Sequence, residues 1–455
     1  MFETTAGAAA PTVKVINLSI GLSYRQFDRA MSPLARLLDW LSYKYRVLFV
    51  VSAGNHAGND RGDDIENLDL GMDLSDFAAL SMDERDSKII DHLNNNSRHL
   101  RLLAPAESVN ALTVGATFDD ATSFTENERW VLPCSNGMIS PISSLGKGMN
   151  NAVKPDIVYD GGRKFVMAST RAPTSTKVRW ANAPTREPGI ISAAPTDIAA
   201  GSSKIMYTFG TSDAAALISH EAGRCYDALQ EVFGTAKRDI PDNHIALSLK
   251  AMLIHGAEWG ELGEKISNIL QWKKREPSDK LHRFIGFGKP DIEKAIECAK
   301  NRVTLMGYGD LKNGEAQLFT LPLPFDFSSN KLSRRLTATL TFFSPIVSSR
   351  QKYRAADVWF TIENSKKNLL DARINASDKA VTRGSVQHEI FENEQTVVWD
   401  EDGEIRLRVN CRADAAENFS GEIPFALMVS FEIKSDIDID VYTKVAEKVK
   451  PRIIV

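Results

Sequence analysis

Short apolar runs and amphipathic stretches alternate along the first two hundred residues. Residues 13–20 and 47–51 are apolar and rich in β-branched side chains, which indicates two buried strands. Between them, leucines recur at helical spacing behind a proline that suits a first helical turn: Pro33, Leu34, Leu37, Leu38 and Leu41. A strand, a helix and a second buried strand predict a parallel pair joined by a right-handed crossover. Residues 111–116 predict a further strand.

The pattern changes twice before residue 302. Residues 56–105 are acidic and polar, and we interpret them as an insertion that is partly helical over 83–94. Residues 160–204 carry scattered Pro, Gly and Ser and are expected to be loop-rich. Two helices follow, over about 212–230 and 244–255. The second is apolar nearly all round, which predicts that it is buried.

Beyond residue 302 the period of the apolar positions becomes two. Strand patterns cover residues 336–343, 358–362, 386–391, 405–409 and 426–433. Short strands without helices between them favour a β-sandwich of the jelly-roll type. The sequence therefore predicts an α/β domain over 1–302, an all-β sandwich over 303–441 and a helical tail over 442–455.

Composition excludes several classes of protein. The 55 Lys and Arg residues are balanced by 59 Asp and Glu, which gives a net charge of −4, and no basic cluster alternates with aromatic residues, so we do not expect a nucleic-acid partner. No apolar run reaches membrane-spanning length and no signal peptide is recognisable, so we expect no membrane partner and a cytoplasmic location. The four cysteines form no Cys-x-x-Cys pair and are expected to be buried free thiols.

The stretch Gly210-Thr211-Ser212 carries the chemistry. It is a tight turn that ends in a hydroxyl, and the Ala-rich run that follows it predicts a helix. A serine at such a bend lies at the positive end of a helix dipole, as an acyl-transfer nucleophile does. Thr and Ser are also ordinary helix N-caps, so the turn alone leaves a structural role open.

Three other segments, in order along the chain, resemble the catalytic domain of subtilisin-like serine proteases. The matching segments are Val15-Ile16-Asn17-Leu18-Ser19-Ile20-Gly21, Val50-Val51-Ser52-Ala53-Gly54-Asn55, and Ala111-Leu112-Thr113-Val114-Gly115-Ala116 with Lys154-Pro155-Asp156-Ile157 after it. The resemblance covers about residues 13–300. It implies a subtilisin-like parallel sheet with helices on both faces, incomplete at its N-terminal side, and a serine endopeptidase that acts on polypeptides.

The resemblance also assigns roles to residues. Ser212 corresponds to the nucleophile, and Asn55 to the asparagine whose amide donates to the oxyanion. Ser19, Ile20 and Gly21 correspond to the strand end that pairs with an extended substrate. Ala53, Gly54, Gly210 and Thr211 complete the expected substrate-binding set. No cofactor is expected. Family members often bind calcium in loops, but residues 60–64 lack the ligand alternation of a calcium loop.

The aspartate and histidine that such proteases need are missing from the pattern. The family places both before the strand that ends at Ser19-Ile20-Gly21, and residues 1–14 contain neither. His255-Gly256-Ala257 follows Ser212 and is interpreted as structural, and His56 leaves the oxyanion turn and is not expected to be the base. Without a base Ser212 is an ordinary alcohol, so the chain alone is expected to be nearly inactive.

Two hypotheses account for this absence. In the first, the chain is a fragment of a protease, and an N-terminal fragment supplies Asp and His. In the second, a catalytically dead subtilase fold binds peptides or partner proteins. An esterase is disfavoured, because no Gly-x-Ser-x-Gly elbow occurs. Asp213 is a departure from the family, since its charge could oppose a developing oxyanion. Residues 384–391 and 409–413 resemble intracellular subtilases that accompany an AAA-type ATPase, an expected partner; a purely stabilising β domain is the alternative.

Overall fold

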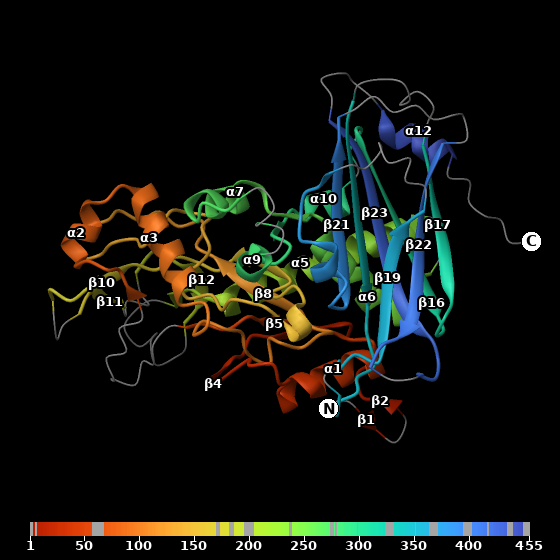
Figure 1. Cartoon of the computed structure of the whole chain (residues 1–455), viewed down its shortest axis with the longest axis horizontal. Helices are drawn as coiled ribbons and strands as arrows, with labels where there is room; N and C mark the ends of the chain where they lie inside the picture. The colour runs from red at the N-terminus through yellow and green to blue at the C-terminus, as the bar shows by residue number, and fades with distance from the viewer. Residues whose placement is uncertain are drawn as a thin grey trace, which may run out of the picture.

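The computed structural model describes most of the chain. The described residues are 3–4, 7–56, 68–169, 173–181, 186–194, 204–235, 239–273, 277, 280–297, 299–323, 332–350, 352–363, 372–394, 403–415, 418–434 and 440–448. Figure 1 shows an α/β part on one side and two upright antiparallel sheets on the other. Short strands β1 (Glu3–Thr4) and β2 (Gly7–Ala8) pair near the N-terminus.

A parallel sheet forms the centre of the α/β part. Its strands lie in the order β3 (Val15–Leu18), β5 (Leu48–Ser52), β8 (Leu112–Thr117) and β9 (Ile157–Asp160). Helix α1 (Pro33–Tyr45) makes the crossover between β3 and β5, and the Ser32 side chain caps it by accepting a hydrogen bond from the amide of Ala35. The predicted strands, the crossover helix and their parallel pairing are confirmed.

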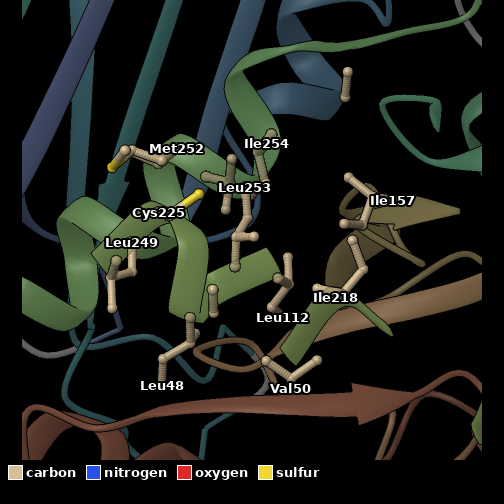
Figure 2. Packing of buried hydrophobic residues seen from close by; sticks show 14 of the residues in the cluster. Leu48, Val50, Leu112, Ile157, Ile218, Cys225, Leu249, Met252, Leu253 and Ile254 are labelled. Carbon is tan, nitrogen blue, oxygen red and sulfur yellow. The ribbon is translucent and has the colours of Figure 1, made fainter. Parts of the chain in front are cut away.

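Helices cover both faces of this sheet because the buried strands alternate their side chains. Leu48 and Val50 of β5 face a core shared with α5 (Thr211–Thr235) and α6 (Asp242–His255). Phe49 and Val51 face the opposite core, which they share with α1. Figure 2 shows the first core, in which Leu112, Ile157 and Ile218 converge with residues of α6. The predicted two-faced α/β arrangement is confirmed.

Residues 68–104 place their helices at the end of the α/β part away from the sandwich (Figure 1). They form β6 (Leu68–Asp69), α2 (Leu74–Ala79), α3 (Met82–Asn95) and β7 (Leu103–Ala104), and β7 pairs with β4 (Leu22–Gln26). Helix α3 confirms the helix predicted over 83–94, and Ser81 and Glu84 form a capping box at its start. Its buried face packs in a third core with β10 (Val166–Ala168) and β11 (Lys177–Trp180).

The region expected to be loop-rich contains more strand than its composition indicates. Within residues 160–204, β10 and β11 pair with each other. In the same region β12 (Ile190–Ala193) pairs with β13 (Ile205–Thr208), which follows directly after the region and leads into α5. After α6 the chain forms β14 (Ala257–Glu258), α7 (Gly260–Ile269), α9 (His282–Ile285), β15 (Lys289–Pro290) and α10 (Glu293–Ile296). A 3-10 turn, Met149–Asn151, lies earlier.

Two antiparallel sheets make up the region after residue 302. One has the order β16 (Arg302–Leu311), β23 (Ile423–Lys434), β18 (Ser333–Phe342), β21 (Val386–Asn393) and β20 (Ala372–Arg373). The other has the order β17 (Ala316–Pro322), β22 (Glu404–Ala413) and β19 (Ala356–Ile362). Their facing side chains share one apolar core, which makes the region a sandwich. Helices α11 (Asp378–Val381) and α12 (Val441–Lys448) complete it.

Buried polar side chains join α6 to the sandwich. His388 Nε2 donates to the carbonyl of Ala257, at 2.9 Å, so its Nδ1 accepts from the Thr339 hydroxyl, at 2.8 Å. The Thr339 oxygen then accepts from His255 Nδ1, also at 2.8 Å. Burial lowers the pKa of His388 to about 4, so both rings stay neutral. The prediction that His255 is structural is confirmed.

Two further predictions concern burial. Cys134, Cys225 and Cys411 are buried free thiols, as expected, and Cys298 lies outside the described residues. Burial raises the pKa of Cys225 to about 12, so this thiol is not a nucleophile at neutral pH. Among the described residues, no helix is long and apolar enough to cross a membrane.

Candidate active site

The turn after β5 brings Asn55 to the carboxyl edge of the parallel sheet. Gly54 makes this turn with a φ of +104°, and a Cβ there would meet the side chain of Leu103 at 2.6 Å. The turn is held from both sides, since the Leu103 amide donates to the Ala53 carbonyl and the Ser144 amide donates to the Gly54 carbonyl, each at 3.0 Å. Asn55 therefore leaves the sheet in a fixed direction.

A second turn brings Ser212 to the same edge. Gly210 links β13 to α5 with a φ of +141°, and its amide donates to the carbonyl of Gly161 at 2.6 Å. A Cβ at this position would lie 2.7 Å from Asn55 Nδ2. Glycine is therefore required here by both its backbone angle and the close approach of the asparagine, and the helix begins directly after it.

Thr211 fixes the orientation of the Asn55 amide. The Thr211 amide and its hydroxyl both donate to Asn55 Oδ1, each at 2.9 Å. The same hydroxyl accepts from the Gly54 amide at 3.1 Å, and Thr211 is fully buried. With Oδ1 occupied in this way, Nδ2 is the end of the amide that has no partner among the described residues. It is the group that can donate to a bound anion.

Ser212 lies in the first turn of α5, half-buried. Its hydroxyl donates to the carbonyl of Ser19 over a long distance of 3.4 Å. In return the Ser19 hydroxyl donates to the carbonyl of Ser212 at 2.9 Å. The structure thus brings Ser212 together with the end of β3, as the sequence predicted, and a weak hydrogen bond leaves its oxygen available.

The residues after β3 border the same edge. The Ser52 hydroxyl donates to the carbonyl of Ile20 at 3.2 Å, and the Ile20 side chain is 42% exposed. Gly21 lies against Gly54, where an added Cβ would stand 3.4 Å from the Gly54 Cα. Ala53 and Gly54 are themselves buried. Of the predicted substrate-binding residues, those of the β3 end are therefore the accessible ones.

No general base stands beside Ser212 among the described residues. His56 follows Asn55, but its Nε2 lies 2.8 Å from the Arg101 carbonyl, and burial lowers its pKa. This contact and the bond from its amide to the Ile142 carbonyl hold the ring away from Ser212. The expectation that His56 is not the base agrees with this geometry.

Asp213 departs from the family pattern, and its surroundings explain how the charge is accommodated. Its carboxylate accepts a hydrogen bond from the Thr208 hydroxyl of β13 at 2.8 Å. Burial raises the pKa of this carboxyl above its ordinary value. The charge is thus directed toward β13, and the raised pKa favours its neutral form more than in a solvated aspartate.

These observations can be compared with known proteins. A model of the subtilase family matches residues 3–288. The chain belongs to the subtilase family. An uncharacterized protein of Sinorhizobium fredii (strain NBRC 101917 / NGR234), y4bN, is 23% identical to this subtilase over an alignment of 466 residues, which covers 96% of each chain.

Two solved structures also resemble this subtilase, both of PatA. The self-cleaved protease domain of PatA is 14% identical, with a TM-score of 0.31, over 63% of this chain and 61% of that one. The patellamide maturation protease PatA is 15% identical, with a TM-score of 0.32, over 63% and 62% of the two chains. This subtilase spans about three fifths of the length of these structures. Scores this low do not support a comparison of individual residues.

The sequence missed how Thr211 acts. It was expected to line the substrate site, whereas its side chain lies beneath the site and orients Asn55. The signal available in the sequence was a residue with a hydroxyl group, Thr211, between Gly210 and Ser212. No group of three or more His, Cys, Asp or Glu residues among the described residues could hold a metal ion, and residues 60–64 lie outside them.

Proposed function

We propose that this subtilase is a serine endopeptidase of the subtilisin type, in which Ser212 attacks the peptide carbonyl. The observation that supports this most is the lock between Thr211 and Asn55, which directs a side-chain amide donor to the edge where Ser212 stands. The Ser212 amide at the start of α5 and Asn55 Nδ2 would then donate to the oxyanion of the tetrahedral intermediate. A purely structural turn needs neither the serine nor an oriented amide.

The substrate in this proposal is an extended polypeptide. Ser19, Ile20 and Gly21 end the edge strand of the parallel sheet, and β3 pairs with β5 alone among the described strands. An extended chain can therefore add to this edge through main-chain hydrogen bonds, with pockets for alternate side chains providing the specificity. Gly21 leaves room for such a close approach, because it carries no side chain.

The proposal requires a base from outside residues 1–455. The proton of Ser212 must pass to a histidine, and a carboxylate must orient that histidine. We therefore propose that a separate N-terminal polypeptide supplies both groups beside Ser212. The Ser212 oxygen forms an ester with the peptide carbonyl carbon as the C–N bond breaks, and the serine proton passes through the histidine to the leaving amine. Water then hydrolyses the ester, which releases the acid product and restores the serine.

A catalytically dead subtilase that binds peptides is the second candidate. The observation in its favour is that no described histidine lies within hydrogen-bonding distance of the Ser212 hydroxyl, since His56 is bound to Arg101. Such a module would use the β3 end for binding and would retain Ser212 without using it.

The sandwich and the location of the protein are the remaining parts of the proposal. The strand orders of the two sheets support a jelly-roll arrangement for residues 303–441. The broad α6 interface favours a stabilising role for the sandwich, and an AAA-type ATPase is the partner protein we propose for its outer face. A cytoplasmic location fits the buried free thiols.

A fluorophosphonate probe, which reacts with activated serines, separates the two candidate functions. The in-frame DNA upstream is read for an Asp-[Ser/Thr]-Gly and a His-Gly-Thr segment, and the polypeptide it encodes is added to residues 1–455. The protease proposal predicts labelling at Ser212 only after this addition, and none in Ser212→Ala. Absence of both segments upstream, or of labelling after the addition, would favour the binding module.

A further inference from the structure

A cavity of about 720 Å³ lies apart from the Ser212 site, between the α/β part and the sandwich. Its walls come from five distant stretches of the chain: 27–36, which leads into α1, 97–101, 146–151, Arg283 and 348–353. It shares no lining residue with the turns at Asn55 and Ser212. Its size is that of a ligand pocket, for which 300–1,000 Å³ is typical.

The lining of this cavity is basic. Seven of its residues carry a positive charge: Arg29, Arg36, Arg98, Arg101, Lys147, Arg283 and Arg350. None of its described lining residues is acidic, although the whole chain has a net charge of −4. Of the seven, Arg101 alone forms an ion pair with a described acid, Asp28, at 2.6 Å. Six cations thus surround one space without a counter-ion from the described part of the protein.

Two of these guanidinium groups are partly withdrawn from water. The Nε atoms of Arg36 and Arg283 are buried and have no hydrogen-bond partner. Arg283 donates from another nitrogen to Asn94 Oδ1 at 2.6 Å, and burial alone lowers its pKa. Burying a charge without a partner is unfavourable, so these groups gain most from an anion that enters the cavity.

The buried carboxylate of Asp39, on α1, is already bound by its neighbours and does not neutralise the cavity. It accepts hydrogen bonds from the Tyr353 hydroxyl and the Ser108 hydroxyl, each at 2.6 Å, and from the Asn110 amide at 2.8 Å. Because Tyr353 is 1% exposed, this bond also fixes the sandwich loop against α1. The wall that carries Arg350 is therefore anchored in place before any ligand arrives.

The rest of the lining suits a ligand with both a charged and a flat apolar part. Phe27, Met31 and Met149 form an apolar wall, and Ser97, Ser348 and Ser349 add hydroxyl donors. Arginine forks bind phosphate oxygens in pairs, so several forks around one cavity match a chain of phosphate groups better than a single carboxylate.

We propose that this cavity binds a small ligand that carries two or more linked phosphate groups, as a nucleoside triphosphate or inorganic polyphosphate does. Arg36 and Arg283 hold the buried end of the phosphate chain, and the exposed Arg98 and Arg350 close over it from the two parts of the molecule. The ligand would bridge the α/β part and the sandwich. This inference is independent of the chemistry proposed for Ser212.

Isothermal titration calorimetry on residues 1–455 tests the proposal with three probes: ATP, inorganic tripolyphosphate and orthophosphate. We expect ATP and tripolyphosphate to bind at physiological salt, at least about tenfold more tightly than orthophosphate. Tighter binding of ATP than of tripolyphosphate would assign the apolar wall to a base, and equal binding would assign the site to the phosphate chain. Failure of both polyphosphates to bind would overturn the proposal.

Two double variants locate the binding. Arg98→Gln with Arg350→Gln changes two exposed side chains of the cavity, so the fold should persist, and affinity should fall by about a hundredfold. Arg406→Gln with Arg408→Gln removes the same charge from β22 of the sandwich and should change affinity less than twofold. An equal loss in both pairs would show that the total charge, and not the cavity, attracts the probes. Unchanged affinity in the first pair would likewise overturn the proposal.

Discussion

Helices α5 and α6 are neighbours in the same core, but they differ in where their polar side chains lie. Helix α5 begins at the open edge of the parallel sheet, where Ser212 is half-buried and weakly bonded. Helix α6 is buried almost throughout, as its apolar surface predicted, and its Lys250 and His255 are bound inside the molecule. Helix α5 presents a serine hydroxyl at the edge of the sheet, and α6 uses its polar groups to join two parts of the protein.

The difference lies in what surrounds each helix. Beside the start of α5, Gly210 and Gly54 replace side chains with bare backbone, so the asparagine and the serine can approach each other. Along α6, the sandwich covers the face that α5 leaves open, and Lys250 donates to the Asn110 carbonyl and the Ser385 hydroxyl at 2.9 Å each. The surroundings of the two helices therefore leave a half-buried serine at the start of α5 and a buried interface along α6.

At neutral pH, the largest effect on stability is expected from a cavity in α6. Leu253 is fully buried, so Leu253→Ala should lower the free energy of unfolding by about 3 kcal/mol. On α5, Val232 is 63% exposed, and Val232→Ala should change the free energy of unfolding by less than about 0.5 kcal/mol. Chemical denaturation of both variants measures the contrast. Similar losses in the two would contradict the burial assigned to α6.

Glycine-to-alanine substitutions should have opposite effects on stability at the turn before α5 and in the middle of that helix. Gly210→Ala forces a side chain into positive φ and onto the Asn55 amide, at an expected cost of about 2 kcal/mol. Gly223→Ala, in the same helix, meets no atom within 4 Å and should stabilise the protein by about 0.5–1 kcal/mol. The melting temperature should therefore fall in Gly210→Ala and rise in Gly223→Ala. A change in the same direction in both variants would contradict the requirement for glycine at position 210.

Lys250 should make stability depend on pH in the alkaline range. Burial lowers its pKa to about 7 from an ordinary value of 10.5, so between these values the unfolded chain binds a proton that the folded chain does not. The free energy of unfolding therefore rises with pH across this window, by at most about 1.4 kcal/mol per unit, and its contribution is constant below pH 7. Lys250→Met should flatten this rise.

The matched control is Lys312→Met, which changes a lysine with a 61% exposed side chain. It should leave the slope of stability against pH between 7 and 10 as in the original protein. A slope that is equally steep in Lys250→Met would show that other groups cause it.

The smallest effect concerns the hydroxyl beneath the site. Thr211→Val keeps the shape of the side chain but removes its bonds to Asn55 and Gly54, at an expected cost of about 1 kcal/mol. Thr211→Ser, which keeps the hydroxyl, should cost clearly less. Urea unfolding of both variants tests whether the hydroxyl, and not the methyl group, stabilises the turn. Equal losses of unfolding free energy in the two variants would contradict a role for the hydroxyl.

The sequence predicted the elements whose pattern is local and missed those that depend on distant contacts. Helix α6 and strands β5 and β8 are mostly apolar, so their burial follows from composition. Strand β16 was not predicted, because Gly307 and Gly309 weaken its pattern, and it is held by pairing with β23 along its whole length. Strand β17 was missed as well; most of its alternate side chains are exposed.

The candidate site was likewise predicted where its pattern is local and missed where it depends on distant contacts. The resemblance of the segments around Asn55 and Ser212 predicted that they meet, and the structure brings them together. The orientation of the Asn55 amide depends on a bond from Thr211, 156 positions away, and could not be deduced from either segment alone. The basic cavity was missed for a similar reason, since its cations come from five stretches that are far apart in the sequence.

The central claim is that residues 1–455 hold a nucleophile and an oxyanion donor but lack the base. The most direct test is the rate at which a fluorophosphonate labels Ser212 as free imidazole, a small external base, is added, with the labelled peptide identified by mass spectrometry. We predict negligible labelling without imidazole, a rate that rises with its concentration, and a rate lower by on the order of 10²–10³ in Asn55→Ala. Rapid labelling without imidazole, or equal rates in Asn55→Ala and the original protein, would contradict the account.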